Sequence, residues 1–131
     1  MEIQIGLRGT AEKLITESDT ARVIKSGTVD VLATPVLSAL MEEAAVAALK
    51  NVLPEGMTTV GVSISLQHKA PTLPGQTVRA EAVVDAVDGK TISFACKAFD
   101  EAGEIGTAEH VRVLVDESRF MAKAASRNKK D

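Results

Sequence analysis

The feature that most constrains the fold is a change of hydrophobic period near residue 57. Residues 36–49 contain no Gly or Pro and carry apolar side chains around almost the whole helical wheel, which is typical of a helix wrapped by protein. From residue 57 onward, apolar and polar side chains alternate, which predicts β-strands. A long antiparallel sheet curled around one buried helix accommodates both patterns. We therefore expect an α+β fold in a single domain spanning residues 1–131.

The predicted helix has well-marked ends. Thr34 is a favoured N-cap residue, and Pro35 suits the first helical position because its missing N–H would have no partner there. Asn51, Pro54 and Gly56 then stop the helix. The helix is therefore expected to begin at residues 34–35 and to end before residue 51.

Four strands are predicted to follow the helix, at residues 57–68, 77–87, 91–99 and 105–115. Asp88-Gly89 is a strong hairpin signal between the second and the third. In the first of these strands, one face is predicted to point into the core. That face carries Val60, Val62, Ile64, Leu66 and His68.

The two ends of the chain have weaker patterns. Short alternations at residues 3–7 and 13–16 predict an N-terminal strand, and the polar segment 17–30 is expected to form a loop or flap. Residues 116–131 are expected to form a short helix followed by a basic tail. One face and the edges of the predicted sheet would remain uncovered, so we expect a homodimer.

Composition argues against several classes of protein. The net charge is −3, and three Phe with no Trp or Tyr provide no platform for base stacking, so neither nucleic acid nor a membrane is an expected partner. The single cysteine, Cys96, cannot form an intramolecular disulfide, and we expect a cytoplasmic protein. With one cysteine and two widely spaced histidines, no metal site is expected.

Three residues of complementary chemistry are expected to meet beside the helix. Glu42 projects from the helix, Thr34 lies at its N-terminus, and His68 ends the core-facing side of the next strand. A carboxylate acts as a base or nucleophile toward a carbonyl carbon, and an imidazole transfers protons near neutral pH. Backbone N–H groups at a helix N-terminus can stabilise a developing oxyanion. The pattern predicts a hydrolytic site.

Other interpretations of these and neighbouring residues are structural. Thr34 can serve simply as an N-cap, and a histidine at a strand end such as His68 is often a hydrogen-bonded structural residue. Glu43 is interpreted as part of a polar edge of the helix, and His110 as structural or interfacial. Cys96 alternates with apolar neighbours and is interpreted as a small core residue rather than a nucleophile.

Four segments, taken together, resemble one known family. They are Val31-Leu32-Ala33-Thr34-Pro35, Leu40-Met41-Glu42-Glu43-Ala44, His68-Lys69-Ala70-Pro71-Thr72-Leu73-Pro74-Gly75 and Glu104-Ile105-Gly106-Thr107-Ala108-Glu109-His110. In this order, within residues 31–120, they resemble the hotdog-fold thioesterases related to fluoroacetyl-coenzyme A thioesterase. The resemblance implies a hotdog fold, in which an antiparallel sheet wraps one long central helix. It also implies hydrolysis of a short- or medium-chain acyl-coenzyme A (acyl-CoA) thioester.

The resemblance assigns roles to four residues. Thr34, Glu42 and His68 match the family's catalytic threonine, glutamate and histidine, and Gly61 matches its active-site glycine, a substrate-binding position. Taken alone, Gly61 can equally mark a bulge. No separate cofactor is implied, because CoA enters as part of the substrate. The chain has no Gly-rich phosphate loop, so CoA is expected to contact scattered basic residues such as Lys69, Arg79, Arg119 and Lys123.

The flap departs from the family's pattern. In fluoroacetyl-CoA thioesterase this segment carries phenylalanines that cover the acyl pocket, whereas residues 17–32 here contain no aromatic residue. We therefore expect this chain to share the family's reaction, thioester hydrolysis, but not its fluorinated substrate. Two other functions remain open at this point. They are a hotdog enoyl-CoA hydratase or dehydratase, and a non-catalytic module that binds acyl thioesters.

Overall fold

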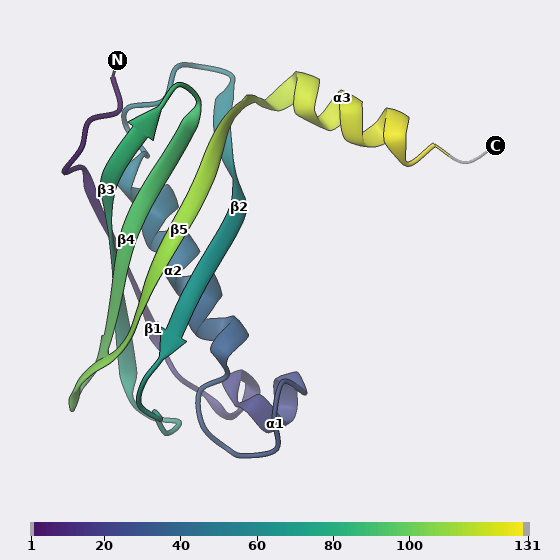
Figure 1. Cartoon of the computed structure of the whole chain (residues 1–131). Coiled ribbons are helices and arrows are strands. Elements are labelled where there is room, and N and C mark those ends of the chain that lie inside the picture. The colour runs from purple at the N-terminus through teal and green to yellow at the C-terminus, as the bar shows by residue number, and fades with distance from the viewer. Residues whose placement is uncertain (1, 130–131) are drawn as a thin grey trace.

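One antiparallel sheet curves around one long helix in the computed structural model, which describes residues 2–129 (Figure 1). The sheet has five strands in the order β1-β3-β4-β5-β2. The strands are β1 (Arg8–Leu14), β2 (Met57–His68), β3 (Thr77–Asp88), β4 (Thr91–Asp100) and β5 (Gly103–Asp116). The helices are the 3₁₀ turn η1 (Glu17–Asp19), α1 (Ala21–Ile24), α2 (Thr34–Ala48) and α3 (Glu117–Arg127). The α+β architecture predicted from the change of period is confirmed.

The predicted ends of three elements are close to the observed ones. Helix α2 begins at Thr34, with Pro35 in its first turn, and the hairpin between β3 and β4 turns at Gly89, whose φ is 62°. Helix α3 follows β5 directly, as expected for the segment after Asp116. The last two residues of the predicted basic tail, Lys130 and Asp131, lie outside the described residues.

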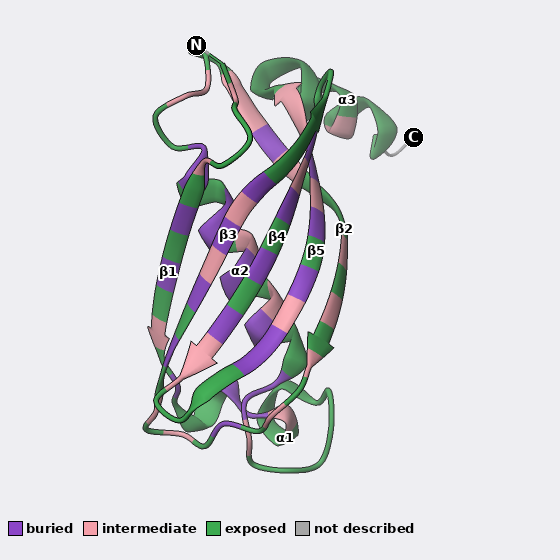
Figure 2. Ribbon diagram, turned by 60° about the vertical axis from the view of Figure 1, so that its left-hand side comes forward, coloured by how far each residue is buried: buried purple, intermediate pink, exposed green. Residues whose placement is uncertain are grey.

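The core lies between α2 and the helix-facing side of the sheet. Buried and more exposed residues alternate along β3 and β4, so that one side of each strand faces α2 (Figure 2). Burial of these aliphatic side chains supplies the main driving force for folding. The buried residues of α2 are Leu37, Leu40, Met41, Ala44, Ala45 and Ala48. The helix is not wrapped on all sides, because Val46 is exposed.

The first strand is not where the alternation of the N-terminal residues predicted it. The expected segments 3–7 and 13–16 give way to a single strand, β1, at Arg8–Leu14, which pairs with β3. Its helix-facing residues are Gly9 and Ala11, both of which are buried. A Cβ atom at Gly9 would collide with the backbone of Ala44 and Ala48 in α2. The prediction was wrong because this close approach excludes the large apolar residues that mark a strand in a sequence.

Strand β2 contains a bulge that changes the face on which Val62 lies. The pairing with β5 shifts register between Gly61 and Ser63. A bulge leaves one residue out of the ladder, and Val62 is 60% exposed instead of facing the core. The predicted core face of this strand is therefore wrong at Val62 and at Val60, because before the bulge Thr59 is the buried residue. Ile64 and Leu66 pack against the core as expected.

Strand β2 lies at the edge of the sheet, next to β5. Helix α3 leaves the body of the molecule from this same side, beyond the start of β2 (Figure 1). An edge strand presents unpaired backbone N–H and C=O groups that can pair with another chain.

Two further features concern the single cysteine and the expectation that no membrane is a partner. Cys96 is 2% exposed, and burial raises the pKa of its thiol to about 11, with Asp85 adding to the shift. Within residues 2–129, no helix has the length and apolar character needed to cross a bilayer.

Candidate active site

Thr34 and His68 form a hydrogen-bonded pair where the start of α2 meets the end of β2. The Thr34 Oγ1 and His68 Nδ1 atoms are 2.8 Å apart. The N-cap residue of α2 is Ala33, and the hydrogen bond of the Thr34 hydroxyl goes to His68 rather than to the helix backbone. The structural interpretation of Thr34 as an N-cap is therefore wrong. Its side chain is instead directed to the imidazole.

The other nitrogen of His68 is the clearest sign of a ligand site. His68 Nε2 is buried, and it is the one buried side-chain nitrogen or oxygen without a hydrogen-bond partner among residues 2–129. Buried polar groups in folded proteins are nearly always paired, so an orphaned one calls for an explanation such as a bound ligand or water. Burial also lowers the pKa of His68, against a smaller opposing effect of the nearby Ala70 backbone. The imidazole is therefore neutral near pH 7.

A cleft of about 320 Å³ lies at this pair. Its other walls come from the flap before α2 and from the loop after β2, and they are mainly aliphatic. The only basic lining residue, Lys69, forms an ion pair with Glu104 at 3.4 Å. The lining residues are Ala21, Ser26, Val29, Val31, Leu32, Thr34, His68, Lys69, Ala70 and Pro71. The cleft is therefore suited to a small apolar group.

Glu42 lies farther along α2, against β2. It is eight residues after Thr34, which corresponds to about 12 Å along a helix axis. A Cβ atom at Gly61 would lie 2.6 Å from Glu42 Oε2, so glycine at this position makes room for the carboxylate. The side chain of Glu42 is 40% exposed and is not fully buried as the wrapped-helix interpretation implied. Within one chain, the site residues thus fall into two pairs, Thr34 with His68 and Glu42 with Gly61.

A buried arginine that the sequence analysis did not single out holds the Glu42 carboxylate. Arg112 Nη1 is 3.5 Å from Glu42 Oε2, and Arg112 itself is only 6% exposed. Its Nε donates to Thr59 Oγ1 at 2.9 Å, and its Nη2 donates to the Thr59 carbonyl at 3.0 Å. These contacts fix the guanidinium, because a buried charge requires hydrogen-bond partners. The sequence offered one signal, since Arg112 lies two residues after His110 and therefore on the same face of the strand.

His110 supports the same arginine. Its Nδ1 lies 2.8 Å from the Ser63 carbonyl oxygen, and its Nε2 lies 3.2 Å from Arg112 Nη1. A carbonyl oxygen only accepts, so the proton is on Nδ1, and Nε2 accepts from the guanidinium. Burial lowers the pKa of His110, and the charge of Arg112 lowers it further. The interpretation of His110 as structural agrees with its 1% exposure and these contacts.

Both imidazoles should make the protein less stable in mild acid. Because the folded-state pKa values of His68 and His110 lie below 6.5, the unfolded chain binds protons more readily than the folded chain. The stability that the protein gains from keeping the two imidazoles neutral is fully present above pH 6.5. It is lost as the pH falls towards the folded-state pKa values of His68 and His110. We expect the Tm to fall between about pH 7.5 and about pH 5.5, and the fall to be smaller in a His68→Gln/His110→Gln variant. Equal pH dependence of the two Tm values would contradict this assignment.

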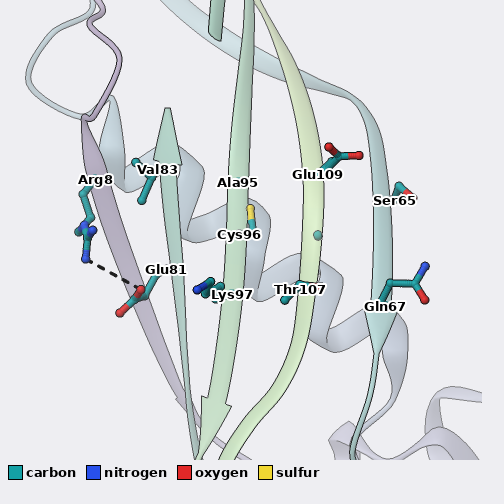
Figure 3. A pocket seen from close by; sticks show the side chains of 11 residues that line it. Arg8, Ser65, Gln67, Glu81, Val83, Ala95, Cys96, Lys97, Thr107 and Glu109 are labelled. Atoms are coloured by element: carbon teal, nitrogen blue, oxygen red, sulfur yellow. Dashed lines mark ion pairs between the residues drawn. The ribbon is translucent and has the colours of Figure 1, made fainter. Parts of the chain in front are cut away.

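A larger pocket, of about 560 Å³, lies elsewhere, on the side of the sheet that faces away from α2. Figure 3 shows its lining side chains, with Arg8 paired to Glu81 and with Lys97 on the neighbouring strand. The pocket contains none of the predicted site residues and no unpaired buried polar atom. Size alone does not identify a site. The smaller cleft at Thr34 and His68 is the better candidate because it contains the orphaned nitrogen.

The expected CoA-binding residues are spread over the molecule. Lys69 lines the cleft, Arg79 stacks on Phe99 at the sheet surface, and Arg119 and Lys123 lie on α3. Within residues 2–129, no three His, Cys, Asp or Glu side chains are grouped so as to hold a metal ion.

Comparisons with known proteins agree on one family. The model of a family described as fluoroacetyl-CoA-specific thioesterase matches residues 15–118. The fluoroacetyl-CoA thioesterase of Streptantibioticus cattleyicolor is 36% identical over 94 residues, which cover 72% of this chain and 68% of that protein. A variant of such a thioesterase, solved in complex with acetyl-CoA, has a TM-score of 0.91 and 28% identity, covering 97% of this chain and 100% of that one. A hot-dog-like protein from Thermanaerovibrio acidaminovorans has a TM-score of 0.88 and 26% identity, covering 98% and 96%.

Proposed function

Because the chain belongs to the fluoroacetyl-CoA-specific thioesterase family, with its hotdog fold and acyl-CoA thioesterase activity, we propose that it hydrolyses short- or medium-chain acyl-CoA thioesters at Thr34, Glu42 and His68. The observation that carries this assignment of the site is the buried, unpartnered Nε2 of His68 beside the Thr34 hydroxyl. A thioester in the cleft would supply the missing partner.

In the proposed reaction, Thr34 and His68 hold the thioester. The Thr34 hydroxyl donates to His68 Nδ1, which leaves the proton of the neutral imidazole on Nε2. That N–H then donates to the thioester carbonyl oxygen, and the negative charge that develops on this oxygen is stabilised. Backbone N–H groups in the first turn of α2 add a partial positive charge at the same end of the cleft.

Glu42 supplies the carboxylate for the bond-making step. As a general base it takes a proton from water while the water oxygen bonds to the carbonyl carbon. As a nucleophile it bonds to that carbon itself and is released later by water. In both routes the carbon–sulfur bond breaks and the CoA sulfur leaves with a proton. The Arg112 guanidinium and the absence of a side chain at Gly61 hold the carboxylate in one place.

A homodimer would bring the two parts of the site together. The separation of Thr34 and Glu42 along α2 is too long for both to contact one carbonyl group in one chain. Glu42 is flanked by two exposed apolar residues, Val46 on α2 and Val62 on the edge strand β2. Burial of these residues against a second copy, with the two β2 strands pairing antiparallel, places Glu42 of one subunit beside Thr34 and His68 of the other.

The volume and the lining of the cleft support a short or medium hydrocarbon acyl chain, rather than fluoroacetyl, as the acyl group of the substrate. The cleft's volume of about 320 Å³ and its aliphatic flap residues Val29, Val31 and Leu32 suit a short or medium hydrocarbon chain. No aromatic side chain stands in this flap to form a closed aromatic cover. We also propose a cytoplasmic location, because CoA thioesters are intracellular metabolites and the one cysteine, Cys96, forms no disulfide.

Thiol release from acyl-CoA esters of graded chain length tests this function. We expect turnover to be highest for a short or medium chain and to be nearly lost in Glu42→Ala and His68→Ala variants. Release no faster than in these variants, across the whole panel, would remove the proposal. Loss of the enoyl chromophore without thiol release would indicate a hydratase, and tight binding without turnover would indicate a binding module.

A further inference from the structure

Helix α3 is exposed along almost its whole length and has no role in the core. It comprises residues Glu117–Arg127, none of which is buried, and it projects from the body of the molecule (Figure 1). Its start is nevertheless well anchored. The Asp116 side chain accepts from Arg119 N at 3.0 Å, and Glu117 N donates to the Gly56 carbonyl at 3.0 Å. The helix therefore leaves the sheet at a defined place.

The basic residues of α3 form one stripe. Arg119, Lys123 and Arg127 are spaced four apart, which places them on one side of the helix. In the part of the chain that the structure describes, none of the three is paired with a carboxylate. The chain as a whole has a net charge of −3, with 15 basic and 18 acidic residues. An unpaired cationic stripe on such a chain is a candidate surface for an anionic ligand.

The proposed dimer determines where this stripe lies. Glu42 lies against Gly61, and Thr34 against His68, so the two parts of the site meet when the partner's Gly61 is opposite His68. In this register the partner's β2 begins four residues earlier, at the partner's Met57, and so extends roughly 13 Å beyond His68. Strand β5 ends where β2 begins, since Asp116 pairs with Met57. The partner's α3 therefore starts just beyond the His68 end of the cleft.

We infer that the basic stripe of α3 binds the phosphate groups of CoA whose acyl group occupies the cleft of the partner subunit. This inference rests on the proposed function and on the dimer proposed with it. CoA carries a pyrophosphate and a 3′-phosphate, which are well matched by arginine and lysine side chains. The cleft itself offers little positive charge for these contacts, because its one lysine, Lys69, pairs with Glu104.

The test compares two substrates that share an acyl group. One is the acyl-CoA, and the other is the acyl thioester of N-acetylcysteamine, which lacks the nucleotide and its phosphates. In an Arg119→Gln/Lys123→Gln/Arg127→Gln variant, we expect the KM for acyl-CoA to rise about 10-fold to 100-fold with kcat unchanged. The kinetics with the truncated thioester should not change. Folding should not change either, because α3 has no buried residue.

A matched control removes the same charge elsewhere. An Arg8→Gln/Lys13→Gln/Lys97→Gln variant loses three cations, two on β1 at the edge of the sheet opposite β2 and one on β4. Figure 3 shows Arg8 and Lys97 on the outer side of the sheet. The KM of this variant for acyl-CoA should stay close to that of the unchanged protein. An unaltered KM in the α3 variant, or an equal change with the truncated thioester, would overturn the inference. Binding of the unchanged protein to anionic vesicles, with no effect of the α3 variant on KM, would assign the helix to a membrane and overturn it too.

Mixed dimers test whether α3 acts on the partner's cleft. A mixed dimer of a Glu42→Gln chain and a His68→Asn chain has one intact site. That site takes the cleft with Thr34 and His68 from the Glu42→Gln chain and takes Glu42 from the His68→Asn chain. The α3 changes should raise KM only when they are placed on the His68→Asn chain, and the reverse pattern would refute binding across subunits. Failure of the proposed function would look different, since neither substrate would then release thiol from the unchanged protein.

Discussion

Replacing Glu42 by glutamine should lower kcat for acyl-CoA hydrolysis by about 1,000-fold or more. Glutamine keeps the size of the side chain but cannot take a proton from water or attack a carbonyl carbon. Arg112 and Gly61 can still hold the amide in place, so the loss should arise from chemistry rather than folding. Thiol release under saturating substrate measures the change. An unaltered Tm would show that the variant is folded.

The next residue in the chain provides the control. Glu43 is exposed, and no hydrogen bond or ion pair from its side chain is seen among residues 2–129. Glu43→Gln removes the same charge at the next helical position, about 100° around the axis. It should leave kcat within about twofold of the unchanged protein. Equal losses in the two variants would rule out a specific role for Glu42.

Mixing two inactive variants should restore activity if the site is shared. A Glu42→Gln chain keeps Thr34 and His68, and a His68→Asn chain keeps Glu42. Random pairing makes half of the dimers mixed, and each mixed dimer has one intact site of two, so about a quarter of the full activity should return. A site contained within one chain would give no recovery. A protein that sedimentation shows to be a monomer would also exclude the shared site.

Replacing Gly9 by alanine should destabilise the fold by about 3 kcal/mol or more. The added Cβ would meet the backbone of α2 at Ala44 and Ala48, which cannot move aside as a flexible side chain can. Either β1 must leave the helix or the helix must shift, and both changes open the core. Urea unfolding should show a lower midpoint, or the variant should fail to accumulate as a folded protein.

Thr10→Ala serves as the comparison for Gly9→Ala. Thr10 is the next residue of β1 and is exposed, so its change should cost no more than about 0.5 kcal/mol. A Gly9→Ala variant as stable as Thr10→Ala would mean that β1 and α2 are not packed as closely as the structure shows.

Elements with a strong hydrophobic period were the ones that the sequence predicted well. The helix around Leu37–Met41 and the strands from Met57 onward follow the periods of 3.6 and 2, and a Gly-containing turn separates β3 from β4. Strand β1 was misplaced because its packing depends on Gly9, which has no side chain to reveal a period. The bulge at Val62 was missed because it interrupts the hydrogen-bonded pairing of β2 with β5, whereas apolar and polar residues still alternate in the sequence.

The candidate site was predicted only in part. The contact of Thr34 with His68 agrees with the prediction, because the ends of two well-predicted elements meet there. The roles of Thr34, Glu42, His68 and Gly61 in catalysis stay predictions. Arg112 was missed because Val111, Val113 and Val115 make the opposite face of β5 look like the apolar one in the sequence. Its burial depends on Thr59 and His110, which come from different parts of the chain.

The burial of Cys96 has a practical consequence for every assay described above. A reactive cysteine would disturb an assay of thiol release in two ways. Its thiol could take the acyl group from the substrate by exchange, and it could react with the aromatic disulfide reagent and add to the colour from released CoA. Cys96 is 2% exposed and burial raises its pKa to about 11, so almost none of it is thiolate at neutral pH. The native protein can therefore be followed by colorimetric titration of free CoA without first being made cysteine-free.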